Sequence, residues 1–178
     1  MPNKILLDSK KIEIILRRLV YELIENHKDF DETVLLGLQP RGIFFIDKIL
    51  EVFKRDHPNI KIKSGILDYT FFRDDFRRSE KTLSASLTKI DFSIENKNVV
   101  LIDDVLFTGR SIKAAMSSID TYGRPKSIEL LVLIDRRFKR EIPIAANYCG
   151  AKIDTFKGDR VKVLWGEKLK DNVIYIES

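Results

Sequence analysis

The chain has 178 residues, of which 44% are hydrophobic, enough for one well-filled domain and short for two, so we interpret residues 1–178 as a single domain. The net charge of +5 permits an anionic partner such as a nucleotide or RNA but does not require one. A single cysteine, Cys149, excludes an internal disulfide, and the sequence has neither a membrane-spanning apolar run nor a secretory signal. We therefore expect a soluble cytoplasmic protein.

The first predicted element is a helix that begins after Leu7-Asp8, with Asp8 as its N-cap. Its core-facing positions recur at helical spacing and are Ile12, Ile15, Leu16, Leu19 and Leu23. Arg17 and Arg18 lie off this stripe, and we expect them to be exposed.

A buried-type strand is predicted at Thr33–Leu38, and it leads through a tight loop into a helix. The apolar side of that helix carries Ile43, Ile46, Ile49, Leu50 and Phe53. The loop contains Pro40, Arg41 and Gly42, and backbone amides at a helix N-terminus together with a guanidinium suit phosphate oxygens. An ordinary strand-to-helix turn would explain the proline and glycine equally well, so this motif alone is weak evidence for a phosphate-binding site.

Residues Ile60–Tyr69 alternate enough to predict a third strand. The stretch Phe71–Lys81 that follows is charged and poorly periodic, and a long loop of this kind in a compact domain is either an exposed connection or a lid. Leu83–Phe92 is interpreted as the strand that returns from this loop.

The most informative stretch is Asn98–Met116. The run Val99–Ile102 predicts a strand buried on both faces, and it ends in two acids, Asp103 and Asp104. A helix follows with Ile112, Ala115, Met116 and Ile119 expected on its buried face. The loop between them offers amides, hydroxyls and a glycine to a phosphate, and consists of Phe107, Thr108, Gly109, Arg110 and Ser111. Adjacent carboxylates can accept hydrogen bonds from a diol or hold Mg²⁺ through water, so the stretch predicts a pocket for a ribose 5-phosphate.

The remaining chain predicts a helix end at Gly123, a buried strand at Ser127–Ile134 and short terminal strands at Val161–Leu164 and Val173–Ile176. The segment Phe138–Phe156 is interpreted as irregular. Trp165 is interpreted as a packing residue.

The strand, acid pair and Thr-Gly loop resemble the phosphoribosyl-diphosphate (PRPP) signature of the type I phosphoribosyltransferases. The resemblance implies an α/β fold with a central, mainly parallel sheet flanked by helices and a mobile loop or hood over its carboxyl edge. It implies that Asp103 and Asp104 act on the ribose and on Mg²⁺ indirectly, through PRPP and water. It further implies that Phe107–Ser111 bind the 5′-phosphate, that Pro40, Arg41 and Gly42 bind pyrophosphate in a strained loop with a cis peptide at Pro40–Arg41, and that Arg73 and Arg77 close over the pyrophosphate. A cis bond at Gln39–Pro40 would cost least.

Further stretches resemble one branch, the bifunctional pyrimidine-operon regulator and uracil phosphoribosyltransferase family (PyrR). They are Asp68–Phe76, Val105–Ser111, Gly123–Pro125, Val132–Arg136 and Arg140–Ile144. Purine-specific relatives usually place an aspartate before the Thr-Gly, where it exchanges a proton with the purine, but this chain has Phe107 there. The apolar ring argues against a purine base, and the resemblance favours uracil, with Asp135 and Arg136 positioning the base-binding loop beside Phe107.

The same family binds leader RNA of pyrimidine operons, so an RNA-binding regulator with weak or residual transferase activity is the alternative. Its candidate residues are Arg17, Arg18, Arg137, Lys139, Arg140 and Lys152. The chain departs from the regulators at Arg137–Glu141, where their Gly-His-Arg-Glu is missing, and at Ala145, where they have arginine, so the plain enzyme is favoured. Family members form dimers or larger homo-oligomers. A receiver-type domain is disfavoured because receivers carry their acid pair at the first strand.

Overall fold

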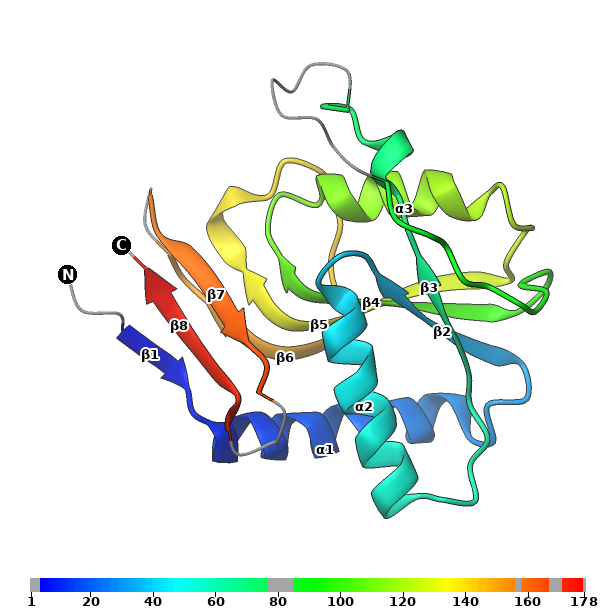
Figure 1. The fold of residues 1–178 in the computed structure, drawn as a ribbon, viewed down its shortest axis with the longest axis horizontal. Coiled ribbons are helices and arrows are strands. Elements are labelled where there is room, and N and C mark those ends of the chain that lie inside the picture. Colours follow the sequence, from blue (N-terminus) through cyan, green and yellow to red (C-terminus); the bar gives the residue numbers. More distant parts are fainter. Residues whose placement is uncertain (1–3, 77–84, 156–157, 167–170, 178) are drawn as a thin grey trace.

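The structure, a computed structural model, describes residues 4–76, 85–155, 158–166 and 171–177. A parallel sheet has the spatial order β3 (Lys63–Leu67), β2 (Thr33–Leu38), β4 (Asn98–Leu106), β5 (Ser127–Arg136) and β6 (Tyr148–Ile153). A smaller antiparallel sheet beside it has the order β1 (Lys4–Leu7), β8 (Val173–Glu177) and β7 (Arg160–Leu164) (Figure 1). The predicted α/β fold with a central parallel sheet is confirmed.

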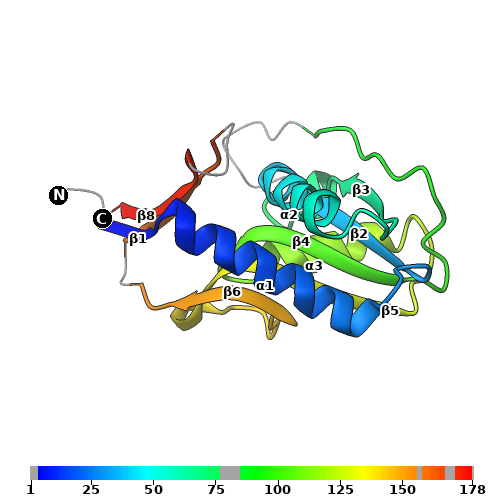
Figure 2. The ribbon, with the colours of Figure 1, turned by 90° about the horizontal axis from the view of Figure 1, so that it is seen from below.

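Helices cover both faces of the parallel sheet. Helices α1 (Ser9–His27) and α2 (Gly42–Asp56) pack on one face, and α3 (Arg110–Ile119) packs on the other. The views in Figures 1 and 2 show α1 running beneath the strands, alongside β6. Asp8 accepts a hydrogen bond from the Lys11 amide at 2.9 Å, so the predicted N-cap of α1 is present. Two short 3₁₀ turns, η1 (Thr70–Phe72) and η2 (Arg137–Lys139), follow β3 and β5.

The core divides into two apolar layers on either side of the sheet. The stripe predicted for α1 is buried, with Ile15 only partly so. All six residues of β2 are buried, as expected for a strand covered on both faces. The prediction for Met116 is wrong, because its side chain is 41% exposed and the inner face of α3 is completed by Ala114 and Ser118 instead.

The sheet has a topological switch point between β2 and β4. From β2 the chain crosses through α2 to β3, whereas from β4 it crosses through α3 to β5 on the opposite side. The pairing of β2 with β4 ends at Gly37–Ile102, while β4 continues along β5 as far as Leu106–Asp135. A crevice at the carboxyl ends of the strands forms at such a point, and open α/β sheets bind their ligands there.

Several predicted boundaries differ from the structure. The strand expected at Ile60–Tyr69 is limited to β3. Of the strand expected at Leu83–Phe92, residues 83 and 84 lie outside the described part, and the rest forms only a bridge between Lys89 and Ile66. The segment Phe138–Phe156 is not wholly irregular, since it contains β6. That strand was missed because its alternation is masked by Gly150 and Ala151, and β1 was missed because it has only four residues.

The cis peptide lies at Gln39–Pro40 rather than at Pro40–Arg41. The smaller sheet stands beside the carboxyl edge of the parallel one and joins the α1 and α2 layer through Val161, Val163, Trp165 and Ile174. None of the helices in the described ranges combines the length and apolar character that crossing a bilayer requires.

Candidate functional site

The acid pair lies within β4, beside the switch point. Asp103 and Asp104 belong to the strand rather than following it, because β4 runs on to Leu106. Alternation along the strand turns Asp103 toward the α3 layer and Asp104 toward the α2 layer, as it does for Leu101 and Ile102 before them. Both residues are buried, with 9% and 4% of their surface exposed.

Burial sets the charge state of these acids. The pKa of Asp103 is raised to about 8, first by desolvation and then by the neighbouring charge of Asp104. Desolvation also raises the pKa of Asp104, while Arg41 opposes that shift. Apart from the Asp104 amide, which donates to Asp103 Oδ1 at 2.9 Å, few groups in the described ranges compensate the pair. Carboxylates held in this way are typical of sites that await a positively charged or hydrogen-bond-donating ligand.

The loop after β2 closes one side of the crevice. Its backbone passes so close to β4 that a Cβ on Gly42 would lie 2.3 Å from the Ile102 carbonyl oxygen, so only glycine is accommodated. This contact brings Arg41 Nη1 within 3.9 Å of Asp104 Oδ2, although half of the Arg41 side chain is exposed. Pro40 lies with Gln39 at the wall of a neighbouring cavity that also contains Tyr69 and Arg73. The structure therefore brings the predicted pyrophosphate loop to the acid pair.

The loop after β4 forms a small cradle at the start of α3. Gly109 has φ +89°, a conformation that glycine adopts without strain. Among the described residues, no backbone carbonyl accepts a hydrogen bond from the amides of Thr108, Gly109 or Ser111. A cavity of about 140 Å³ lies in front of this loop, lined by Arg73, Asp74, Asp75, Thr108, Arg110 and Ser111. Thr108, Arg110 and Ser111, three of the five residues predicted to hold a phosphate, thus line a cavity.

Two arginines of this region are already engaged. Arg110 binds Asp74 and Glu141, and the latter contact is 2.5 Å long. Arg73 binds Asp75 through two hydrogen bonds of 2.8 and 2.6 Å, and this contact raises its pKa. Each would have to exchange a carboxylate for a phosphate oxygen. Arg77, the other predicted lid arginine, lies outside the described residues.

Phe107, Asp135 and Arg136 meet at the ends of β4 and β5. The Arg136 guanidinium carbon lies 3.9 Å from the centre of the Phe107 ring. The guanidinium nitrogens of Arg136 donate to Thr155 Oγ1 at 3.1 and 3.0 Å and to the Asp159 carbonyl oxygen at 2.9 Å. Desolvation lowers the pKa of Arg136. Arg136 therefore supports the Phe107 ring, and Asp135 binds the guanidinium of Arg140.

Sequence reasoning missed residues on two sides of the crevice. Trp165, expected to be only a packing residue, stacks on Phe45 at 5.8 Å and also lines a cavity of about 220 Å³ together with Phe44, Arg41 and Asp104. Burial, and then the charge of Asp103, raises the pKa of Tyr69, while a side-chain hydrogen bond with Ser111 opposes that shift. Only the arrangement of the smaller sheet brings Trp165 here. The position of Tyr69 directly after β3, at the same edge, is the signal that points to it.

The basic residues considered for RNA are mostly paired within the chain. Arg17 lies near Glu13 and Asp56, Arg18 binds Glu22 and the carbonyls of Cys149 and Gly150, and Arg137 binds Asp154 through two hydrogen bonds. Arg18 thereby attaches α1 to β6. The side chains of Lys139 and Lys152 make no hydrogen bond or ion pair within the described ranges. Arg140 points into the protein rather than toward this surface.

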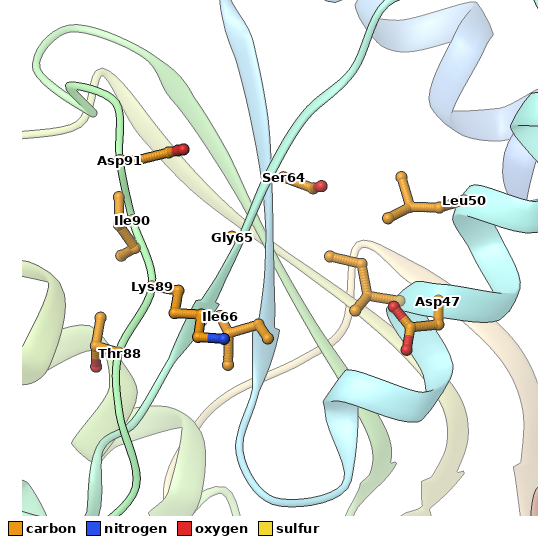
Figure 3. A pocket seen from close by; sticks show the side chains of 10 residues that line it. Asp47, Leu50, Ser64, Gly65, Ile66, Thr88, Lys89, Ile90 and Asp91 are labelled. Carbon is orange, nitrogen blue, oxygen red and sulfur yellow. The ribbon is translucent and has the colours of Figure 1, made fainter.

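A further cavity, of about 560 Å³, lies beside β3, the outermost strand of the parallel sheet (Figure 3). Asp47 and Leu50 of α2 face residues 88–91 across β3, and Ser64, Gly65 and Ile66 form its floor. Burial raises the pKa of Asp47. None of the predicted site residues lines this cavity, so it does not belong to the crevice at the switch point.

The fold and the comparison with known families assign this chain to the phosphoribosyltransferases. The family model described as "Phosphoribosyl transferase domain" matches residues 2–172. Similar solved structures include hypoxanthine phosphoribosyltransferases from Trypanosoma cruzi (TM-score 0.69, 17% identity, 97% of this chain and 95% of that one) and Staphylococcus aureus (TM-score 0.64, 21% identity, 85% and 77%). At these identities the structures support the fold and say nothing about the base.

The chain belongs, more narrowly, to the family of proteins named bifunctional protein PyrR. It is 40% identical over 175 residues to the protein of that name from Caldicellulosiruptor bescii, covering 98% of this chain and 95% of that one. It is 40% identical over 168 residues to the one from Enterococcus faecalis, covering 94% and 93%. The family suggested by the sequence motifs and the predicted enzyme class are confirmed.

Proposed function

We propose that the protein transfers the phosphoribosyl group of PRPP to uracil, forming UMP and pyrophosphate. The observation that carries this proposal is the convergence of two buried acids, the Arg41 loop and the Thr108–Ser111 cradle at one switch point. These groups match the three parts of PRPP, namely its ribose hydroxyls, its pyrophosphate and its 5′-phosphate.

The transfer is a displacement at the ribose C1 through an oxocarbenium-like transition state. Asp103 and Asp104 accept hydrogen bonds from the ribose hydroxyls and stabilise the positive charge that develops on the sugar. Arg41 of the Pro40–Gly42 loop, with Arg73 and Arg77, holds the departing pyrophosphate, and the amides and hydroxyls of the cradle hold the 5′-phosphate. A uracil anion needs no general base, so no residue is assigned that role.

Magnesium is part of this proposal. The described residues include no cluster of three or more potential metal-binding side chains. Two neighbouring carboxylates can still take part in a site completed by pyrophosphate oxygens and water, because Mg²⁺ prefers oxygen ligands and retains several waters. Mg²⁺ bound there would neutralise charge on the leaving group, while Asp103 and Asp104 would orient its waters.

Uracil is proposed because of Phe107. An apolar ring at this position cannot exchange a proton with a purine nitrogen, and the ring is held by Arg136. Asp135 is proposed to position the same base-binding loop through Arg140.

The test is an assay of nucleotide formation from PRPP and Mg²⁺ with uracil, hypoxanthine, guanine or orotate. We expect UMP to form with a kcat/KM at least about tenfold above that for any other base, which corresponds to about 1.4 kcal/mol of discrimination. Preference for hypoxanthine or guanine would overturn the choice of uracil. No nucleotide from any base would overturn the proposed activity.

An RNA-binding regulator of pyrimidine genes is the second candidate, and the name "bifunctional" of the relatives favours it. Lys139 and Lys152 are the residues best placed to meet phosphates, whereas Arg17, Arg18 and Arg137 would have to exchange partners inside the chain. A gel shift with the organism's own pyrimidine leader RNA across a salt series tests this role, because phosphate contacts make affinity fall steeply with salt. An equal shift with an unrelated RNA would contradict specific regulation.

We also propose that residues 1–178 form one domain and that the chain assembles as a homodimer or larger homo-oligomer. The exposed side chains of Phe44, Phe71 and Leu87 provide apolar surface for such contacts. Light scattering across a concentration series would measure the assembly.

A further inference from the structure

The side chain of Arg140 connects two segments of the crevice. Its Nη1 donates to the carbonyl oxygen of Phe107, and its Nη2 donates to the carboxylate of Asp135. Both side chains of the ion pair are largely buried, with 19% of Arg140 and 12% of Asp135 exposed. The residue considered for RNA therefore directs its guanidinium into the protein, between the ends of β4 and β5.

The residues next to Arg140 support the same loop from behind. The amides of Glu141 and Ile142 donate to the Thr108 carbonyl at 2.9 and 3.0 Å. A Cβ on Gly109 would lie 3.2 Å from Ile142 Cβ and 3.6 Å from Arg140 Cδ, so this segment is packed against the cradle. These backbone contacts hold the 5′-phosphate cradle, and Arg140 adds the connection to Asp135.

A guanidinium suits this connection for two reasons. Its planar fork presents donors in fixed directions, so that one group fixes the spacing between the Phe107 peptide and Asp135. Its charge also compensates the carboxylate of Asp135, of which only 12% is exposed. If Arg140 is removed, the Phe107 backbone gains freedom, and a nearly buried carboxylate loses its partner.

We propose that Arg140 is a positioning residue for the transfer reaction, which sets the distance between the sugar phosphate held by the cradle and the base held beside Phe107. This inference rests on the proposed function. It assigns Arg140 to the spacing of the two substrates and not to the RNA-facing surface. Because the backbone contacts of Glu141 and Ile142 remain when the side chain changes, PRPP alone should still bind.

The experiment compares Arg140→Met and Arg140→Lys with the wild-type chain and with Arg55→Ala. Arg55 is a matched control, since it is another arginine in contact with carboxylates, those of Asp56 and Glu13, in the last turn of α2. We expect Arg140→Met to lower kcat/KM for uracil about 10–100-fold, the range that a misplacement of about 1 Å can cause. Its Kd for Mg²⁺–PRPP in the absence of uracil should stay within about threefold of wild type.

The conservative variant distinguishes positioning from a general loss of structure. Arg140→Lys keeps the charge and can donate to both acceptors, so we expect it to recover most of the activity that Arg140→Met loses, and Arg55→Ala should match the wild type. Wild-type kcat/KM in both Arg140 variants would overturn the inference, as would an equal loss of PRPP affinity. A wild-type chain that transfers no base would overturn the proposed function and this inference with it.

Discussion

At the amino ends of β2, β5 and β6, buried polar side chains satisfy one another, whereas the buried acid pair near the carboxyl end of β4 has few partners in the described ranges. His27 forms a hydrogen bond of 3.0 Å with the hydroxyl of Thr33 and one of 3.1 Å with the hydroxyl of Tyr148. The Tyr148 hydroxyl in turn donates to Glu129 at 2.7 Å. Desolvation, by contrast, raises the pKa of both Asp103 and Asp104, the charge of Asp104 raises that of Asp103 further, and one guanidinium lies 3.9 Å from Asp104. The first group stabilises the fold, while the second keeps hydrogen-bonding capacity that a ligand can use.

The polar network at the amino ends of the strands and the acid pair of β4 have opposite effects on the stability of the fold. A closed polar network fixes the strands that it joins, here β2, β5 and β6 together with the end of α1. Two neighbouring desolvated acids destabilise the empty protein, and in the proposed function sugar hydroxyls and Mg²⁺ would compensate them. Mutations at the two ends should therefore separate stability from activity.

The largest expected effect is on turnover, in Asp104→Asn. Loss of the charge proposed to stabilise the sugar cation should lower kcat by about 100–1,000-fold, the cost typical of removing one preorganised electrostatic group. The melting temperature should stay the same or rise, because a desolvated carboxyl is removed. Steady-state kinetics and thermal unfolding measure both. Unchanged turnover would remove Asp104 from the proposed mechanism.

The next effect is on the pH dependence of stability, in Asp103→Asn. The folded-state pKa of Asp103 is about 8, well above its ordinary value near 4, so between these values the folded chain keeps a proton that the unfolded chain releases. The unfolding free energy of the wild type should therefore fall as pH rises from about 4 to 8.

Asp103→Asn should make that fall shallower and should be the more stable protein at pH 8, by on the order of 1–3 kcal/mol. Urea unfolding at pH 5, 6.5 and 8 measures the difference. Equal slopes for the two proteins would show that Asp103 is already ionised in the empty crevice. In the wild type, kcat/KM should rise toward pH 8, because the ionised carboxylate is the form that accepts hydrogen bonds from ribose.

The smallest effect concerns the other end of the sheet, in Tyr148→Phe. The ring is kept, but the hydroxyl between His27 and Glu129 is lost, which should cost about 1 kcal/mol of unfolding free energy. Because this network lies at the amino ends of the strands, kcat and KM should match those of the wild type. A tenfold loss of kcat/KM with unchanged stability would contradict the separation of the two ends.

Much of the fold could be predicted because its elements are locally encoded. The apolar period of α1 with its Asp8 cap, the uniformly buried β2 and the Asn98–Met116 stretch each follow from neighbouring residues. Strands β7 and β8 of the smaller sheet were also predicted, but β1 and the assembly of the sheet were not, since β1 and β8 pair across almost the whole chain length. Strand β6 likewise obtains its place from β5 and from Arg18 of α1.

The candidate site divides in the same way. Spacing along the chain identified the acid pair, the cradle and the Arg41 loop. It could not show that Arg140 points inward to Phe107 or that Trp165 reaches the Asp104 cavity, because both depend on side-chain directions set by distant segments. The charge of Arg140 suggested an exposed surface residue. Its hydrogen bonds to the Phe107 carbonyl and the Asp135 carboxylate show instead that the guanidinium points inward.

The most direct measurement is calorimetric titration of the wild-type chain with PRPP and Mg²⁺ in the absence of any base. We expect saturable binding of one PRPP per chain, competition by pyrophosphate, and a large loss of affinity in a variant that carries both Asp103→Asn and Asp104→Asn. Heat of binding that is absent at millimolar PRPP, or that is unchanged in the double variant, would show that the crevice beside β4 is not where the sugar phosphate binds.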